Sequence, residues 1–287
     1  MYFFKNEQKT FEIEKFHIGG QPGEYPTLVF GGIRKVNSQN KEELKEYIKI
    51  QKELSESLKL SSSIDMFIRE KEHIQERIDF ATENTSEPFL IDLPFKQIEL
   101  KEEVLKYLSQ RGLQNRVIYN SINFATSPEE ISLIKKYGIN SAILLALDIA
   151  NFGTDGSLNL LEKKLIPFAE EAGVKNMLVD PGTMPFDSEN IAGEVLKSIM
   201  VIKSQTGLPV GCAMINLAES WEYFKGLKEN GYSETIAALN SNALMMGADF
   251  LIYGPIKMAR NILPSIAATN KICAESNKRY FGVESKR

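Results

Sequence analysis

The stretch Asn176-Met-Leu-Val-Asp-Pro-Gly-Thr183 has the pattern of a buried strand that ends on a carboxylate. Three apolar residues precede Asp180, and the Pro-Gly pair after it favours a sharp turn. Similar apolar runs end at Asp92, Asn120 and Asp148. A continuous apolar run bounded by turn signals is typical of a parallel strand buried on both faces. Because the C-terminal ends of such strands meet at one face of a parallel barrel, we expect these polar residues to gather there.

Outward from this stretch, the sequence alternates predicted strands with predicted helices. The strands are expected at 27–31, 62–67, 88–92, 116–122, 141–147, 176–180, 208–214 and 249–254. The helices are expected at 42–58, 71–82, 101–110, from 127 onward, and at 159–172, 189–204, 218–228, 235–246 and 256–278. This alternation, with glycine at several helix ends, predicts an α/β fold of the (β/α)8 TIM-barrel class. A doubly wound sheet is the alternative, but no G-x-G-x-x-G follows the first strand.

The N-terminal residues 1–26 precede the first strand–helix unit. Residues 11–18 alternate apolar and polar side chains, which predicts a short hairpin that closes the floor of the barrel. Residues 19–26 are rich in glycine and proline and predict a loop. No linker or low-complexity segment divides the chain. We therefore expect residues 1–287 to form a single (β/α)8 barrel domain, with the hairpin and loop of residues 1–26 as its N-terminal part.

The charge, the cysteine content and the apolar runs of the chain indicate which partners and which cell compartment to expect. The net charge is −4 and the sequence pI is about 5.5, which lacks the basic footprint of a nucleic-acid-binding protein. The two cysteines, Cys212 and Cys273, lie far apart and form no C-x-x-C motif, so we expect a cytoplasmic protein. Charged residues begin within the first few positions, which argues against a signal peptide. No apolar run approaches the ~20 residues that span a bilayer, so no membrane insertion is expected.

The predicted strand ends present a ring of acids, amides and hydroxyls. The members are Asp65, Asp92, Asn120, Ser121, Asn123, Asp148, Asp180, Asn216 and Ser220. Because the ring holds no histidine or lysine, a serine hydrolase triad and a Schiff-base aldolase are disfavoured. No Cys/His cluster predicts a zinc site. The roles of Asp148 and Asn123 stay open, because Asp and Asn are also common in turns.

Two chemistries fit this set of side chains. Carboxylates on neighbouring strand ends, such as Asp92, Asp148 and Asp180, could hold Mg²⁺ through oxygen ligands. Alternatively, acids and amides could bind a planar heterocycle that carries both donors and acceptors. A carboxylate accepts two parallel N–H bonds from an amino-pyrimidinone edge, and amides serve the remaining ring atoms.

The sequence resembles the H subunit of tetrahydromethanopterin S-methyltransferase through nearly its whole length. The matching phrases are residues 18–27 (IGGQPGEYPT), 88–92 (PFLID), 118–123 (IYNSIN), 209–211 (PVG), 218–221 (AESW) and 247–256 (GADFLIYGPI). The first and third of these phrases are the specific ones. The resemblance implies a pterin-binding methyltransferase barrel that moves a methyl group between N5 of a reduced pterin or folate and the cobalt of a corrinoid protein.

The resemblance also implies roles for residues of the polar ring. In the wider group of pterin methyltransferases, polar residues after strands three, four, six and seven bind the pterin. The matching positions here are Asp92, Asn120 with Ser121, Asp180 and Asn216. Asp65 joins them as a further expected binding residue from the polar ring, and Asn216 is expected to act in catalysis beside N5. No metal ligand is expected.

Two departures from the pattern of this family bear on the substrate. The segment after the first strand, residues 31–35, is short and has no histidine, and Ile215-Asn216 stands where the pattern has His-Asn. We therefore expect a soluble methylcobamide:tetrahydrofolate methyltransferase of methylotrophic, methylamine or betaine-type one-carbon metabolism. Its cofactors would be tetrahydrofolate and the corrinoid of a partner protein, and we expect a homodimer.

Four other functions compete with this one. The first is a tetrahydromethanopterin-specific methyltransferase subunit, and the second is a Mg²⁺-dependent barrel lyase. The third is a pterin-binding or scaffolding subunit that needs partners for catalysis. The fourth, dihydropteroate synthase, is disfavoured because the last strand ends in Tyr253-Gly-Pro-Ile-Lys257 and lacks a Ser-x-Arg element.

Overall fold

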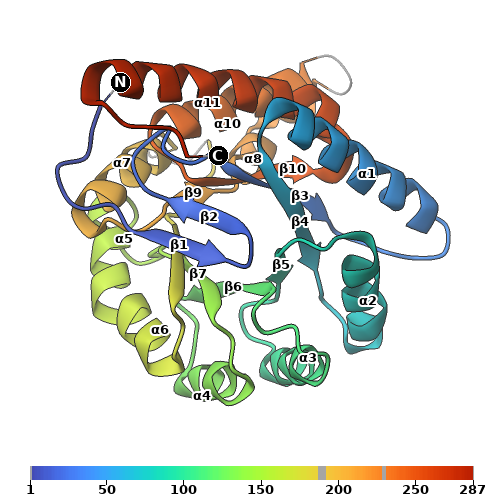
Figure 1. The fold of residues 1–287 in the computed structure, drawn as a ribbon. Helices are drawn as coiled ribbons and strands as arrows, with labels where there is room; N and C mark the ends of the chain where they lie inside the picture. The colour runs from blue at the N-terminus through green and yellow to red at the C-terminus, as the bar shows by residue number, and fades with distance from the viewer. Residues whose placement is uncertain (1, 187–191, 228–230, 287) are drawn as a thin grey trace.

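The computed structural model describes residues 2–186, 192–227 and 231–286. Within this part of the chain, eight parallel strands form one sheet in the order β8-β7-β6-β5-β4-β3-β10-β9. Their bounds are β3 (Leu28–Ile33), β4 (Ser61–Phe67), β5 (Phe89–Asp92), β6 (Val117–Asn123), β7 (Ser141–Leu145), β8 (Asn176–Asp180), β9 (Gly211–Cys212) and β10 (Phe250–Pro255). The two edges meet where Val179 bridges Val210 in parallel, so the sheet nearly closes into a barrel (Figure 1). The predicted (β/α)8 class is confirmed.

Helices surround the sheet. They are α1 (Lys41–Leu58), α2 (Ile74–Asn84), α3 (Ile98–Gln110), α4 (Pro128–Tyr137), α5 (Thr154–Leu160), α6 (Ile166–Ala172), α7 (Glu194–Thr206), α8 (Met214–Ser220), α9 (Glu222–Lys225), α10 (Tyr232–Met245) and α11 (Ala259–Phe281). Short 3-10 turns, η1 (Lys71–His73) and η3 (Ile256–Met258), precede α2 and α11, and a π-turn, η2 (Leu161–Leu165), joins α5 to α6. No helix of the described residues is long and apolar enough to span a bilayer.

Local sequence explains where several helices begin and end. At α4 the Ser127 hydroxyl accepts a hydrogen bond from the backbone N–H of Glu130 at 3.3 Å, and proline occupies the first turn. The same helix ends at Gly138, whose φ of 71° is the left-handed conformation that glycine adopts without a Cβ clash. Helix start and stop signals therefore placed this element correctly.

The N-terminal hairpin lies across the end of the barrel where the strands begin. Strands β1 (Thr10–Ile13) and β2 (Phe16–Gly19) pair antiparallel, and Figure 1 shows them crossing the barrel opening that faces the viewer. Ile13, Phe16 and Ile18 are buried, and the Lys9 N–H donates to the Gly207 carbonyl at 2.7 Å just ahead of β9. The predicted hairpin is confirmed, and it leaves the opposite end of the barrel open for the polar ring.

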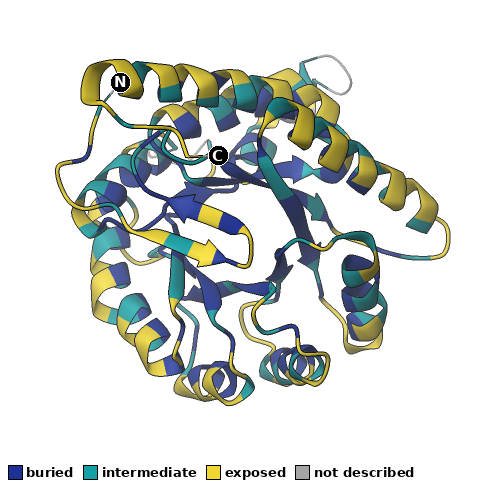
Figure 2. Cartoon of the chain, viewed as in Figure 1, coloured by how far each residue is buried: buried dark blue, intermediate teal, exposed yellow. Residues whose placement is uncertain are grey.

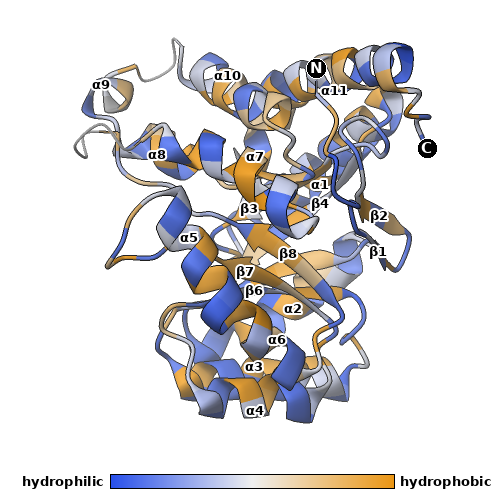
Figure 3. Cartoon of the chain, turned by 90° about the vertical axis from the view of Figure 1, so that its left-hand side faces the viewer, coloured by the Kyte–Doolittle hydropathy of each residue, from blue (hydrophilic) through white to orange (hydrophobic). Residues whose placement is uncertain are grey.

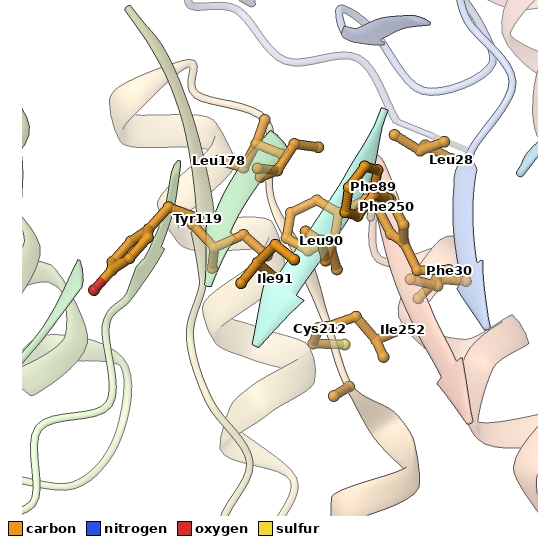
Figure 4. Close-up of a cluster of buried hydrophobic side chains, with 14 of the residues drawn as sticks. Leu28, Phe30, Phe89, Leu90, Ile91, Tyr119, Leu178, Cys212, Phe250 and Ile252 are labelled. Atoms are coloured by element: carbon orange, nitrogen blue, oxygen red, sulfur yellow. The ribbon is translucent and has the colours of Figure 1, made fainter. Parts of the chain in front are cut away.

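The strands form the core because they are apolar on both faces. They are dark in the burial view of Figure 2, whereas the outer faces of the helices are exposed. Figure 3 shows β7 and β8 as hydrophobic ribbons between helices with mixed surfaces. Leu90, Phe89 and Phe250 belong to a buried cluster drawn from several strands of the barrel, and the ring of Tyr119 points away from the other labelled side chains (Figure 4). Burying each such side chain favours the folded state by roughly 1.5–3 kcal/mol.

The stretch between β8 and α10 differs from the prediction. The expected strand 208–214 contains only the two residues of β9, because Pro209 has no N–H to donate and α8 already begins at Met214. Gly211 packs so closely that a Cβ there would lie 2.1 Å from the carbonyl oxygen of Phe250. The expected helix 218–228 is instead two short helices that break at Trp221, whose backbone is extended. Residue 228 and the first residues of the expected helix 189–204 lie outside the described residues.

Candidate active site

A cavity of about 590 Å³ opens at the C-terminal ends of the strands. All six residues that were predicted to bind the ligand line it: Asp65, Asp92, Asn120, Ser121, Asp180 and Asn216. They come from β4, β5, β6, β8 and the first turn of α8. The parallel barrel therefore brings together side chains that are far apart in sequence.

Asp180 is the most buried acid on the β8 side of the cavity. The residue is 7% exposed, and its Oδ1 accepts a hydrogen bond from the Gly182 N–H at 2.7 Å. Gly182 has a φ of 75°, and a Cβ at this position would lie 2.7 Å from Leu147 Cβ, so the turn requires glycine. Burial raises the pKa of Asp180 from 3.8 to about 7, against the opposing effect of the Gly182 hydrogen bond. A group with this pKa changes charge readily near neutral pH.

A second group of charges lies on the β4–β5 side. Arg69 donates from Nη2 to Asp92 Oδ1 at 2.7 Å and from Nη1 to the backbone carbonyl of Asp92 at 2.6 Å. Burial raises the pKa of Asp92, although Arg69 opposes the rise. Asp65 is 1% exposed, and neither of its carboxylate oxygens has a hydrogen-bond partner among the described residues. Burial and then the nearby Asp92 hold the pKa of Asp65 well above its usual range.

The orphaned carboxyl of Asp65 is a physical sign of a ligand site. A buried polar group without a partner costs free energy, and native proteins rarely keep one without a use. Asp65 pairs in register with Leu90 of β5, so it lies one strand away from Asp92 at the floor of the same cavity. A ligand with N–H or O–H groups would satisfy it.

Asn120 and Ser121 stand at an irregularity in β6. The pairing of β6 with β7 shifts register between Asn120 and Ile122, and such bulges redirect side chains near the ends of barrel strands. Asn120 is half-buried, and its side-chain amide has no hydrogen bond from the described residues. Its donor and its acceptor both stay available to a ligand. Ser121 is 4% exposed beneath it.

Asn216 occupies the first turn of α8, just past the short strand β9. Its side chain is exposed toward the cavity, and no group in the described ranges hydrogen-bonds to its amide. It is therefore the most accessible amide of the six residues. A second cavity of about 210 Å³ adjoins this position and shares Asp180, Asn216 and Phe95 with the first.

Three other members of the predicted ring have local structural roles. The Asn123 side chain donates to the Ser121 carbonyl at 3.0 Å and accepts from the Ala125 N–H at 2.9 Å. The Asp148 Oδ1 accepts from the Ala150 N–H at 2.8 Å, and Asp148 lines neither cavity. The Ser220 hydroxyl donates to the Leu217 carbonyl at 2.6 Å. These side chains build turns at the barrel mouth.

The structure also reveals residues that sequence reasoning missed. Arg34, Phe67, Arg69, Phe95 and Lys257 line the cavity. Each follows or ends a strand, but a single arginine or phenylalanine in a loop carries no recognisable motif. The one available signal was that each lies at or shortly after the end of a predicted strand.

A buried ion pair supports the β5–α3 loop from below. Lys101 is 1% exposed, and its Nζ donates to Glu130 Oε2 at 2.6 Å and to the Phe95 carbonyl at 2.9 Å. The Tyr119 hydroxyl donates to the other oxygen of Glu130 at 2.8 Å. The network thus ties the loop carrying Phe95 to β6 and α4, which keeps the cavity wall in place.

The charge pattern of the cavity bears on a metal site. Among the described residues, no group of three or more His, Cys, Asp and Glu side chains is placed to hold a metal ion. The Mg²⁺ alternative required Asp148 together with Asp92 and Asp180, and Asp148 lies outside the cavity. The carboxylates of the cavity can accept hydrogen bonds from the N–H groups of a ring, and the amides can both donate and accept.

The fold and the cavity define a TIM-barrel protein with a polar cavity at the C-terminal ends of its strands, which is where enzymes of this fold have their active sites. The solved structures of similar fold include a dihydropteroate synthase from Xanthomonas albilineans, with a TM-score of 0.67 and 15% identity over 93% of this chain and 98% of that one. The Yersinia pestis dihydropteroate synthase is similar, with a TM-score of 0.65 and 13% identity over 92% and 98% of the two chains. At these identities the likeness shows the fold alone.

The family follows from the sequence comparisons. The model of the tetrahydromethanopterin S-methyltransferase MtrH subunit family matches residues 6–286, and the chain belongs to this family. It is 31% identical to the H subunit of tetrahydromethanopterin S-methyltransferase from Methanopyrus kandleri, over 99% of this chain and 96% of the relative. It is 30% identical to the H subunit of the putative methyltransferase mtx from Methanosarcina acetivorans, over 96% and 94%. The predicted resemblance and the prediction of a methyltransferase are confirmed.

The comparisons also bear on the choice of pterin. The relative from M. kandleri and that from Methanothermobacter thermautotrophicus are both named for tetrahydromethanopterin. The prediction of tetrahydrofolate has no support from these names, and the tetrahydromethanopterin alternative fits them better.

Proposed function

We propose that the chain transfers a methyl group between N5 of a reduced pterin held in the 590 Å³ cavity and the cobalt of a corrinoid carried by a partner protein. The observation that carries this proposal is the convergence of acids and amides from separate strands on one cavity within a methyltransferase family. The names of the relatives favour tetrahydromethanopterin, and tetrahydrofolate is the second candidate because of the short segment after β3 and the Ile215-Asn216 pair.

Asp180 and Asp92 would hold the pyrimidine edge of the pterin. Two N–H groups on that edge match the two oxygens of one carboxylate, and such charge-assisted bonds are about twice as strong as neutral ones. Asn120 offers both a donor and an acceptor to the remaining ring atoms. The burial that raises the pKa of Asp180 is a cost in the free protein, and ligand N–H donors would relieve it.

Asn216 would act at N5. This nitrogen gains or loses a bond to carbon during transfer, so its need for a hydrogen-bond donor or acceptor changes. A side-chain amide supplies either without a change of its own charge. The corrinoid supplies the cobalt that exchanges the methyl group. The chain itself would bind the pterin, orient N5 toward the open mouth and exclude water from the ring.

Assembly and compartment are further parts of the proposal. We propose that residues 1–287 form one barrel domain, with the N-terminal hairpin included, and that the chain acts in the cytoplasm without inserting into a membrane. A homodimer is supported by apolar side chains exposed on α11, such as Ile272 at 59% and Tyr280 at 70%. The corrinoid protein is the expected second partner.

The test mixes the pure protein with methylcobalamin and either tetrahydromethanopterin or tetrahydrofolate, and follows the cobalamin absorbance. We expect demethylation with at least one of these pterins. Asn216→Ala should lower the rate by about 10²–10³-fold, as loss of a transition-state donor does elsewhere, with less effect on pterin affinity. Asp148→Asn is the matched control and should keep the full rate. A wild-type rate equal to the protein-free background, with no pterin binding, would refute the proposal.

A further inference from the structure

Three cationic side chains line one arc of the cavity mouth. Arg34 follows β3, Arg69 follows β4, and Lys257 follows β10 in the turn η3. These strands are consecutive neighbours in the sheet, in the order β10-β3-β4. The cations therefore stand side by side along this part of the rim, although they come from distant parts of the sequence.

The arc is held in place by aromatic and buried groups. The guanidinium carbons of Arg69 and Arg34 lie 4.8 and 6.0 Å from the centroid of the Phe67 ring. Arg77, which is 5% exposed, donates to the backbone carbonyls of Phe67 and Arg34 and so ties the two loops together. The positive groups are thus part of a built wall and are not scattered over a solvated surface.

Acidic side chains form ion pairs with only two of the three cations in this arc. Arg69 pairs with Asp92 at 2.7 Å, and Arg34 pairs with Glu219 at 3.2 Å. Lys257 is exposed and has no ion pair with any residue in the described ranges. Asp65 lines the same cavity, and burial followed by the nearby Asp92 raises the pKa of its carboxyl. Of the three lining cations, Lys257 is therefore the one whose charge no ion pair among the described residues balances.

Aromatic side chains surround other parts of the mouth, after β5 and β8 and next to α8. Phe95 packs edge-on against Phe124 at 5.7 Å between ring centroids, and Phe186 stacks on Trp221 at 5.0 Å. Phe95 and Tyr223 are exposed, at 42% and 66%. Among the residues that line the cavity, the cations Arg34, Arg69 and Lys257 all follow the neighbouring strands β10, β3 and β4, so an anionic extension of a bound ligand would be attracted toward this arc.

We infer that Arg34 and Lys257, with Phe67 between the loops, form a subsite for the anionic tail of the pterin, which carries carboxylates or phosphate. This inference rests on the proposed pterin methyltransferase function and adds the direction in which the ligand leaves the cavity. The ring lies between Asp92, Asn120 and Asp180, and the tail runs out over β3 and β10. The aromatic side chains on the other parts of the mouth stay uncovered for the partner protein.

The test compares binding of pterins with and without a charged tail. Isothermal titration calorimetry would use tetrahydrofolate, tetrahydromethanopterin and 6-methyltetrahydropterin, which has the ring alone. We expect the wild-type protein to prefer a tailed ligand at least about tenfold at low salt, and to lose most of this preference at high salt because exposed charges are screened. Lys257→Gln and Arg34→Gln should each reduce the preference about threefold, which is typical of exposed ion pairs.

Controls separate the subsite from general charge effects. Lys35→Gln and Arg260→Gln remove exposed cations next to each position that do not line the cavity, and they should leave the preference unchanged. If 6-methyltetrahydropterin binds as tightly as the tailed ligands, or if Lys257→Gln weakens all of them equally, the subsite is refuted while the proposed function stands. If no pterin binds the wild-type protein, both proposals fail.

Discussion

Replacing Asp180 by asparagine should stabilise the folded protein while it weakens pterin binding. Asp180 is 7% exposed, and burial raises the pKa of its carboxyl from 3.8 to about 7. Above pH 7 the folded protein must keep a charge in this environment, which the unfolded chain keeps in water. Asparagine has the same shape, retains an oxygen for the Gly182 N–H, and carries no charge.

The magnitude follows from the two pKa values. Between pH 3.8 and about 7 the folded state binds more protons than the unfolded state, so the free energy of unfolding falls as the pH rises. The loss is about 1.4 kcal/mol per pH unit, or about 4 kcal/mol in all, and it is complete above pH 7. The free energy of unfolding of Asp180→Asn should therefore equal that of the wild type near pH 4. At pH 8 it should be larger than the wild-type value by up to about 4 kcal/mol.

Urea denaturation at pH 5, 6, 7 and 8 measures this gap. Asp148→Asn is the control for the loss of a carboxylate at the barrel mouth, because Asp148 is only partly buried and lies outside the cavity. Calorimetry on Asp180→Asn should show pterin affinity falling about 100-fold, because the amide nitrogen of the introduced side chain would face ligand N–H donors. A variant that is less stable than the wild type at pH 8, or a gap that does not change with pH, would refute the reasoning.

Two further predictions concern the same site and its support. Only the ionised form of Asp180 accepts two ligand N–H bonds, so pterin affinity measured by calorimetry should fall about tenfold per pH unit below about pH 7 and level off above it; a flat profile would contradict the assigned role. Lys101→Met should lower the free energy of unfolding by about 3–5 kcal/mol in urea melts, because it leaves Glu130 buried without its cation. Lys136→Met removes the exposed ion pair with Glu102 and should change the free energy of unfolding little. If both variants lowered it equally, burial of the Lys101–Glu130 pair would not be the cause.

Much of the barrel could be predicted because its signals are local. Apolar runs that end at Asp92 and Asp180 need only a few residues to be recognised, and both strands end at these positions in the structure. The strand at Gly211 could not be predicted to the same accuracy. Its length depends on close packing against Phe250 from β10 and on the early start of α8, which no local pattern encodes.

For the polar ring, too, the sequence predicted part of the site and the tertiary structure decided the rest. From the sequence, Asn120 and Asn123 are similar candidates, because both are polar residues near the end of one strand. In the folded protein the Asn123 side chain makes hydrogen bonds with the backbones of Ser121 and Ala125, whereas Asn120 lines the cavity. The pairing of β6 with β7 shifts register between Asn120 and Ile122, and only the folded structure shows that Asn120 is the one of the two that lines the cavity.

By itself, the sequence determined the order of strands and helices, the family, and the positions of Asp92, Asn120 and Asp180 at strand ends. These properties depend on neighbours along the chain, and a parallel barrel necessarily collects its strand ends at one face. The tertiary structure alone decided that Asp180 titrates near neutrality and that Arg34 and Lys257 share one side of the mouth. Burial and through-space charge arise only when distant segments pack together, so no local reading of the chain could supply them.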